Sequence, residues 1–188
     1  MDLQSTMSSQ EFFNKQQTQV MKRSNFDRSH TYKTTFNAGN LIPFYVDEAL
    51  PSDTATLESR AFGRLATPLK PIMDSIFLDT HFFSVPYRLV WNGFKSMMGE
   101  QDPSYSGTNM IPISNSDTGL SELSNHDYMG LPTKVPNLNF SNLPLRALRL
   151  IWGEYYRDQD LEPLITPYDK PDGPDVALNY SALYPHLS

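Results

Sequence analysis

The chain has 188 residues, of which 39% are hydrophobic and 12% aromatic, so it favours one domain with a core over wholesale disorder. Fifteen prolines argue against a helix bundle, since proline removes a helical donor, and the lack of cysteine excludes disulfides, thiolate zinc sites and cysteine nucleophiles. The formal net charge is −6, but residues 1–33 hold five basic and three acidic residues, so a leader of net charge +2 precedes an acidic body.

The first segment, residues 1–21, is rich in Ser, Gln and Thr and has no sustained hydrophobic period. It is predicted to be a flexible N-terminal arm unless something outside the domain holds it. It lacks a basic stretch followed by an apolar run, so we expect no secretory signal, and we expect no membrane span anywhere in the chain.

Three extended segments follow the arm. Residues 42–46 alternate apolar side chains with Pro43 and Tyr45, which favours an edge strand, and a second extended run is predicted over 54–65. The clearest strand is predicted over 75–85, where alternate side chains such as Phe82 and Phe83 point to opposite faces.

Two short helices are predicted further along the chain. After Pro86, a helix over about 87–98 places Trp91, Phe94 and Met98 on one stripe, and Gly99 is placed to end it.

The second helix is predicted to open at Asn142-Leu143-Pro144, after a long loop over about 100–140 that is rich in Ser, Asn, Gly and Pro. Its apolar face is predicted to consist of Leu145, Leu148, Trp152 and Tyr155. Its arginines, Arg146, Arg149 and Arg157, are expected to lie largely off that face. Since only three or four strands are visible, the predicted sheet is incomplete and needs covering by other chains or by further polypeptide.

No pattern in the sequence supports catalysis or metal binding. The acids of Asp158, Asp160 and Glu162 superficially resemble a calcium loop, but Pro163 occupies the position where that loop needs glycine, so a solvated helix end is favoured. The four histidines lack metal-ligand spacing, and neither a G-x-S-x-G elbow nor a glycine-rich phosphate loop occurs. The predictions are therefore no enzyme activity, no cofactor and no metal.

One segment indicates nucleic-acid binding, because it interleaves basic and aromatic side chains. The candidate contact residues are Lys22, Arg23, Phe26, Arg28, Tyr32 and Lys33. The alternative is an ordinary polar leader to the first strand, and Asp27 dilutes the positive charge.

Several collinear stretches resemble the amino-terminal part of the major capsid protein of gokushoviruses, small single-stranded DNA phages of the microvirus family. The stretches are RSNFDRSH (23–30), KTTF (33–36), GNLIPFYVDEAL (39–50), AFGRLATPLKPIM (61–73), LDTHFFSVPYRLVW (78–91) and WGEYYRDQDL (152–161).

This resemblance implies a mainly β fold, the antiparallel viral jelly roll, in which two facing sheets form a β-barrel with long loops. It implies that residues 22–188 are the amino-terminal part of such a capsid domain, so that the barrel is incomplete in this chain. The implied function is that of a structural coat protein, with no enzyme activity.

The implied partners are other copies of the chain in a small T=1 icosahedral shell, packaged single-stranded DNA and other phage structural proteins. Host contacts are expected through parts beyond this chain. The implied location is the virion, assembled in the bacterial cytoplasm. The alternative function is a jelly-roll ligand- or carbohydrate-binding module, which shares this architecture.

Overall fold

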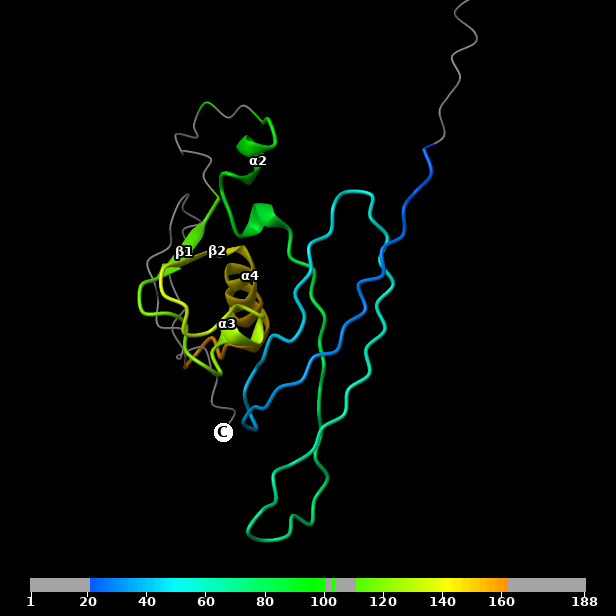
Figure 1. Cartoon of the computed structure of the whole chain (residues 1–188), viewed down its shortest axis with the longest axis vertical. Helices are drawn as coiled ribbons and strands as arrows, with labels where there is room; N and C mark the ends of the chain where they lie inside the picture. The colour runs from blue at the N-terminus through cyan, green and yellow to red at the C-terminus, as the bar shows by residue number, and fades with distance from the viewer. Residues whose placement is uncertain (1–20, 101–102, 104–110, 162–188) are drawn as a thin grey trace, which may run out of the picture. The chain divides into compact units, whose positions relative to one another are not determined.

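A computed structural model describes residues 21–100, 103 and 111–161 (Figure 1). The chain divides into two units, Met1–Tyr32 and Lys33–Ser188. Most of the arm predicted over 1–21 and the acidic segment after Leu161 lie outside the described residues. The elements of the second unit, in order, are η1 (Tyr87–Leu89), α2 (Phe94–Met97), β1 (Ile113–Ser116), α3 (Asn125–Tyr128), β2 (Leu138–Ser141), α4 (Leu143–Ile151) and the π-helical turn η2 (Trp152–Tyr156).

The sheet of the described residues consists of β1 and β2, which pair antiparallel with Ile113 opposite Ser141. Across the pair, Asn115 Nδ2 donates to Asn139 Oδ1 at 2.7 Å. Two isolated strands are marginally stable, so this pair needs a covering layer. The covering includes the His126 ring of α3, which packs edge-on against Phe140 with ring centroids 5.4 Å apart. The structure thus contains antiparallel β pairing, and within the described residues that pairing forms one sheet of two strands.

The helix predicted to open at Asn142 is α4, and its local signals explain why it forms there. Pro144 stands in the first turn, where a missing backbone N–H removes no intrahelical hydrogen bond. The backbone N–H of buried Asn142 donates to Pro112 O at 3.0 Å, which joins the start of α4 to the residue before β1. Leu145 and Trp152 are buried as predicted, and Leu148 is half-buried.

The predicted apolar face of this helix is wrong at Tyr155, which is exposed. After α4 the backbone widens into η2, where Arg157 N donates to Trp152 O five residues back. A π-helical turn changes the angle between successive side chains, so Tyr155 leaves the stripe that Leu145 and Trp152 share. Its ring instead lies against Phe83, with the centroids 4.8 Å apart.

The prediction that the arginines lie off the packed face is wrong for Arg146, which is buried. Its Nη1 donates to the backbone oxygen of Val90 at 3.2 Å. A long aliphatic stem allows arginine to cross apolar surface while its guanidinium reaches a carbonyl. Arg146 therefore joins α4 to the chain just after η1.

The single helix predicted over 87–98 is also wrong, because the chain forms η1, a turn and then α2. Trp91 in that turn is only 1% exposed and forms the core with Val90 and Leu143, whereas Met98 is 65% exposed. Breaking the helix at the turn rotates the following residues, so Met98 does not continue the stripe of Trp91 and half-buried Phe94. Gly99 does end α2 as predicted, with φ +100°.

The predicted loop over 100–140 contains β1, α3 and the beginning of β2. α3 forms because Ser124 caps it, with its Oγ accepting a hydrogen bond from Asp127 N, while Asp127 Oδ2 accepts from Leu123 N at 2.8 Å. Tyr128 of α3 is buried, and its hydroxyl donates to Thr35 O at 3.2 Å. This hydrogen bond ties a segment far back in the sequence to α3.

The three strands predicted over 42–46, 54–65 and 75–85 are wrong, since none of them pairs in a ladder. Figure 1 draws this part of the chain as a trace without helices or arrows. No backbone–backbone hydrogen bond involves the described residues 54–85. Side-chain partners differ along 75–85 as alternation predicts, since Phe82 contacts Phe44 whereas Phe83 contacts Tyr155.

Candidate nucleic-acid interface and covered surface

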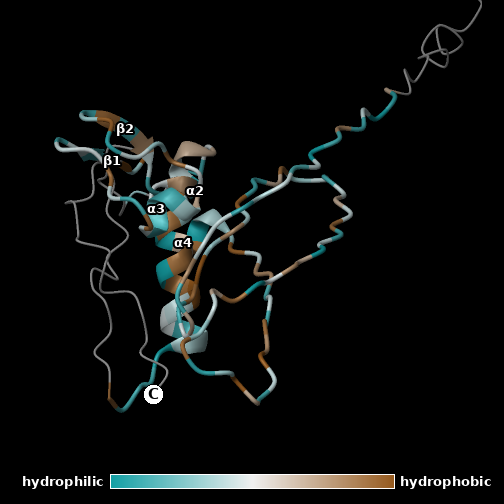
Figure 2. Cartoon of the chain, turned by 60° about the horizontal axis from the view of Figure 1, so that its bottom comes forward, coloured by the Kyte–Doolittle hydropathy of each residue, from teal (hydrophilic) through white to brown (hydrophobic). Residues whose placement is uncertain are grey.

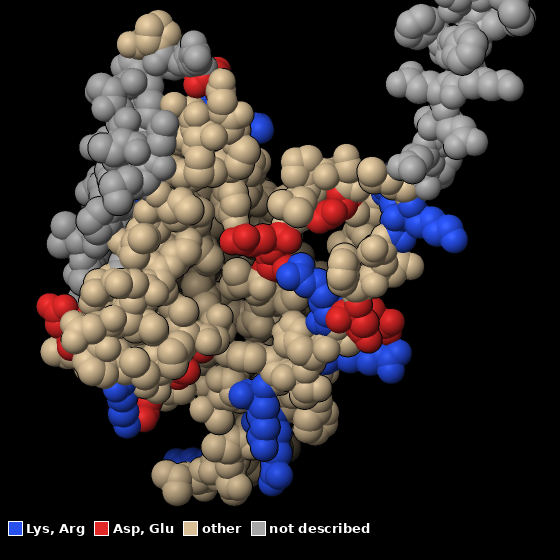
Figure 3. Space-filling view, turned by 45° about the horizontal axis from the view of Figure 1, so that its top comes forward, with Lys and Arg blue, Asp and Glu red and all other residues tan. Residues whose placement is uncertain are grey.

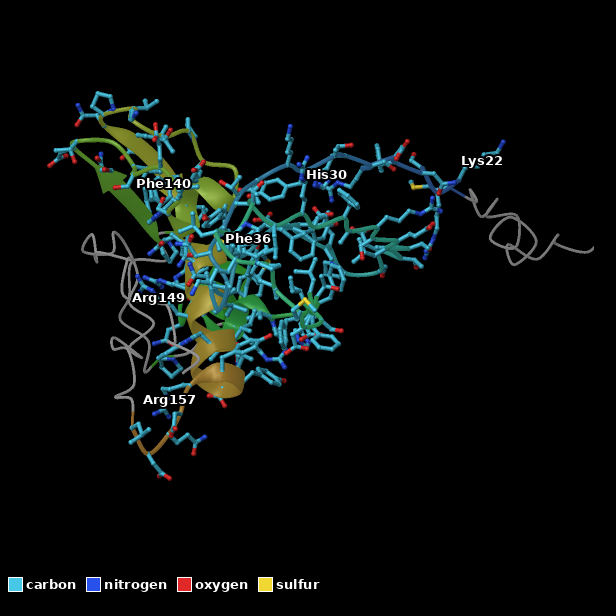
Figure 4. The ribbon with its side chains drawn as sticks, turned by 90° about the horizontal axis from the view of Figure 1, so that it is seen from below. Lys22, His30, Phe36, Phe140, Arg149 and Arg157 are labelled. Carbon is cyan, nitrogen blue, oxygen red and sulfur yellow. The ribbon has the colours of Figure 1, made fainter. Side chains whose placement is uncertain are left out.

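The six residues predicted to contact nucleic acid are all exposed. They are Lys22, Arg23, Phe26, Arg28, Tyr32 and Lys33. The division between the two units of the chain falls directly after Tyr32, so Lys33 belongs to the second unit and the other five to the first. Figure 4 shows Lys22 and His30 on one extended stretch of chain.

Ser29 holds the carboxylate of Asp27, which is the acidic residue within 22–33. Asp27 Oδ1 accepts hydrogen bonds from the backbone N of Ser29 at 2.9 Å and from its Oγ at 2.5 Å. These bonds lower the pKa of Asp27, so its carboxylate is ionised at neutral pH. With four basic residues and one acid, residues 22–33 carry 4 − 1 = +3, and the acid is engaged by Ser29.

The second surface feature is the extended segment 54–85, which presents large apolar side chains to solvent. Figure 2 shows hydrophobic stretches along this part of the trace. Its exposed apolar residues are Leu57, Phe62, Leu65, Leu69, Ile72, Met73, Ile76, Phe77, Leu78, Phe82 and Phe83. A stretch that makes no backbone–backbone hydrogen bond among the described residues and exposes this much apolar surface is typical of an interface that further polypeptide covers.

Within that segment lies a basic and aromatic pattern to which the sequence analysis assigned no role. Arg60, Phe62 and Arg64 alternate at a spacing of two, and Phe62 is 93% exposed. Arg60 forms an ion pair with Glu58, with Nη2 2.8 Å from Oε1. The signal that could have found this pattern is the period of two, which places the three side chains on one side of an extended chain. Figure 3 shows basic and acidic side chains interspersed on the surface.

Two titratable groups of the packed part, His126 and Tyr87, have large pKa shifts. Burial, together with the charge of Arg149, lowers the pKa of His126 to about 4, so the ring is neutral at pH 7. Burial, a hydrogen bond with Glu48 and the charge of Glu48 raise the pKa of Tyr87. Figure 4 shows Arg149 on α4 and Arg157 just beyond η2. His126 and Tyr87 serve packing, because the groups that shift their pKa values, Arg149 and Glu48, belong to the same unit.

The acids near the end of α4 have a structural role. Asp158 Oδ1 accepts hydrogen bonds from the backbone N of Asp160 at 3.0 Å and of Leu161 at 3.3 Å, which closes a turn. Among the residues that the structure describes, no group of three or more His, Asp or Glu could hold a metal ion. Over the same residues, no helix is long and apolar enough to cross a membrane.

A packed part next to an extended apolar segment, which among the described residues makes no backbone–backbone hydrogen bond, is typical of a structural protein that further polypeptide covers. Residues 14–183 match the phage family described as capsid protein (F protein), and the chain belongs to this family. The resemblance to phage capsid proteins is therefore confirmed, and so is the structural class of its function.

Individual relatives agree with this assignment. The chain is 46% identical to the capsid protein VP1 of Chlamydia phage 1 over 158 residues, which cover 80% of this chain and 26% of the relative. It is 43% identical to the capsid protein VP1 of Bdellovibrio phage phiMH2K over 163 residues, 86% of this chain and 30% of the relative. The capsid protein VP1 of Spiroplasma virus 4 is 30% identical over 142 residues, 74% of this chain and 26% of the relative. The chain thus spans 26–30% of the length of these relatives.

Proposed function

We propose that this chain is part of a phage coat protein that assembles with other copies into a closed icosahedral shell. The family match over 14–183 carries the proposal. The shell encloses single-stranded DNA in the virion, after assembly in the bacterial cytoplasm. This role requires no catalytic group. The assembled particle makes the contacts with other phage structural proteins and with the host.

We further propose that the extended segment 54–85 supplies strands to an antiparallel jelly roll. Its backbone makes no backbone–backbone hydrogen bond within the described residues, and its apolar side chains are exposed. Strand edges of this kind pair readily with further polypeptide. Since the matched relatives are more than three times as long as the aligned region, the remaining capsid polypeptide has the length to supply the partner strands and the second sheet.

A chimera tests the coat function directly. The aligned region of this chain replaces its counterpart in the capsid protein VP1 of Chlamydia phage 1, and the chimera is produced in bacteria. Electron microscopy and gradient sedimentation are expected to reveal closed shells. A folded chimera that remains monomeric would contradict the proposal.

The matched control carries Leu69→Ser, Met73→Ser and Phe77→Ser in the same chimera. These side chains are exposed in the isolated chain, so their replacement leaves the packed part intact. Shell formation is expected to fall sharply, because the replaced surface is the one that assembly covers. Melting of the packed part, followed by tryptophan fluorescence, is expected to remain unchanged.

We also propose that the basic leader contacts the packaged DNA through Lys22, Arg23, Phe26, Arg28, Tyr32 and Lys33. Support comes from the exposure of all six residues and from the net charge of +3 over 22–33. The cations neutralise phosphates, while Phe26 and Tyr32 stack on unpaired bases. A leader that instead clamps a neighbouring subunit is the competing arrangement.

Salt dependence distinguishes these two roles of the leader. If four cations neutralise four phosphates, the logarithm of the binding constant falls against the logarithm of salt with a slope of about −3. Replacing Lys22, Arg23, Arg28 and Lys33 with Ala is expected to flatten the slope and weaken binding to all sequences alike. An unchanged slope, with the leader located between subunits in the particle, would favour the clamp.

A further inference from the structure

We propose that Arg60, Phe62 and Arg64 form a second contact site for single-stranded nucleic acid. Phe62 stacks on an unpaired base, and the two guanidiniums contact the flanking phosphates. The proposal deepens the proposed coat function by naming this partner for a segment otherwise expected only to pair with strands. The proposal depends on the coat function in one respect, namely that a shell built from this protein contains nucleic acid.

Residues 54–68 contain no helix, turn or bend, and the side chains of Glu58 and Arg60, two residues apart, meet in an ion pair. Both observations agree with an extended chain, in which residues two apart point to the same side. Arg60 and Arg64 therefore flank Phe62 on one side, roughly 13 Å apart at about 3.3 Å per residue. This arrangement forms a short strip with an aromatic ring between two cations.

The opposite side of the same stretch is apolar. Leu57, Ala61 and Leu65 alternate with the strip, and Leu57 and Leu65 are half as exposed as Phe62. A strand with one apolar side and one charged side buries the apolar side and leaves the other accessible. The strip thus remains available when further polypeptide pairs with segment 54–85.

The exposed ring of Phe62 favours a flat binding partner. Phe62 is 93% exposed and makes no ring contact within the described residues, although burying a phenylalanine side chain lowers the free energy. Stacking on a base satisfies it, and the flanking guanidiniums add phosphate contacts and cation–π attraction. Only unpaired bases offer their faces to a side chain on a flat strand, so a single strand is favoured over a duplex.

Glu58 belongs to the same side of the chain and makes the proposal sharper. Its Oε1 accepts from both Nε and Nη2 of Arg60, at 3.1 and 2.8 Å. Both groups are exposed, so this ion pair is weak and a phosphate competes with it. Removing the carboxylate is therefore expected to strengthen binding.

The test measures fluorescence anisotropy of labelled oligo(dT) with the full 188-residue chain. Phe62→Leu is expected to weaken binding about tenfold, since one lost base stack falls within the range measured for such contacts. Arg60→Gln with Arg64→Gln is expected to lower the salt slope by about 1.4, or 0.7 for each phosphate. Glu58→Gln is expected to tighten binding, and duplex DNA is expected to bind more weakly than oligo(dT).

Matched controls separate the strip from general surface effects. Phe77 is 83% exposed but has Ser75 and Asp79 two residues away, so Phe77→Leu is expected to leave binding unchanged. Arg88→Gln with Lys95→Gln removes the same charge from η1 and α2, where the intervening rings of Trp91 and Phe94 are buried and half-buried, so this variant is expected to leave the salt slope unchanged. Light scattering establishes that every variant has the oligomeric state of the parent chain.

Ultraviolet crosslinking to oligo(dT) with mass spectrometry provides a second measurement, and the crosslink is expected on the peptide that contains Phe62. The proposal is overturned if Phe62→Leu and Phe77→Leu behave alike, or if the crosslink maps only to residues 22–33. Shell formation by the chimera with Phe62→Leu reports on the coat function separately. If shells form while oligo(dT) binding is unaffected by the strip variants, the strip is wrong and the coat function stands.

Discussion

The packed part, from η1 to η2, and the extended segment 54–85 use similar side chains with opposite results. Trp91 is 1% exposed and Trp152 is buried, whereas Phe62 and Phe77 are almost fully exposed. Helical turns close their own backbone hydrogen bonds, so they only need side-chain packing to be stable. An extended segment cannot form backbone hydrogen bonds within itself. It needs a partner strand before its backbone is paired and its apolar side chains are buried. One region of this chain is thus packed by its own residues, whereas segment 54–85 leaves its backbone and its apolar side chains to be covered under the proposed function.

The largest expected difference between the two regions comes from truncating an aromatic side chain in each. Trp91→Ala should lower the free energy of unfolding by about 3–5 kcal/mol, because it empties the core site beside Val90 and Leu143. Phe77→Ala should change it by less than about 0.5 kcal/mol. Urea denaturation, followed by fluorescence of Trp152, measures both. Equal effects would show that segment 54–85 is already packed in the isolated chain.

Acid should destabilise the packed part through His126. The folded state holds the pKa of this ring near 4, whereas the unfolded chain protonates it near 6.5. The free energy of unfolding therefore falls as the pH drops from about 6.5 to 4, by up to about 3 kcal/mol.

A phenylalanine variant provides the control for this pH dependence. His126→Phe keeps a ring against Phe140 and removes the titrating group that faces Arg149. It should flatten the stability curve between pH 6.5 and 4 in urea denaturation. An unchanged curve would place the pH dependence elsewhere.

Two glycines with similar backbone angles, Gly119 inside the packed part and Gly39 in the chain before segment 54–85, extend the comparison to the main chain. Gly119 (φ +87°) lies against the backbone of Lys134, so an added Cβ would approach Lys134 Cα to 2.8 Å, whereas Gly39 (φ +82°) has open space. Gly119→Ala should cost about 1–3 kcal/mol, and Gly39→Ala only the backbone cost of about 1 kcal/mol. Thermal unfolding of both variants checks this order, and a reversed order would contradict the packing at Lys134.

The smallest expected effect concerns side chains that bond to nearby backbone. Ser124→Ala removes the cap of α3 and should cost about 0.5–1 kcal/mol. Asp74→Ala removes a similar bond, from Ser75 N to Asp74 Oδ1, in the extended segment and should leave stability unchanged. Hydrogen exchange of the α3 amides is the measurement, and equal protection in both variants would contradict the contrast.

The elements with local signals are the ones that the sequence predicted. Asn142 and Pro144 located the start of α4, and Gly99 located the end of α2, because caps and breakers act within a few residues. Trp91 is buried as predicted although it lies between η1 and α2, and the burial of Trp152 also followed from helical spacing. The break between η1 and α2 and the π-helical turn at Trp152 did not, since each depends on what packs against the helix rather than on its own residues.

The two candidate nucleic-acid contact sites also differ in whether the sequence alone predicted them. The leader residues from Lys22 to Lys33 were found because bases and rings are interleaved within twelve residues of sequence, and their contact with nucleic acid remains a prediction. The strip of Arg60, Phe62 and Arg64 became visible only when the structure showed Phe62 exposed and the flanking stretch without backbone partners.

By itself, the sequence determined the kind of protein, the start of α4, the end of α2 and the charge of the leader, because motifs, caps and charges are local properties. Only the tertiary structure decided that Arg146 lies inside, that Tyr155 lies outside and that the predicted strands have no ladder. Each of these outcomes depends on residues far apart in the chain: Arg146 needs the carbonyl of Val90, and Tyr155 faces Phe83. A strand has no stable form until a distant backbone supplies its hydrogen bonds, so alternation in the sequence predicts the faces of segment 54–85 but not its partner.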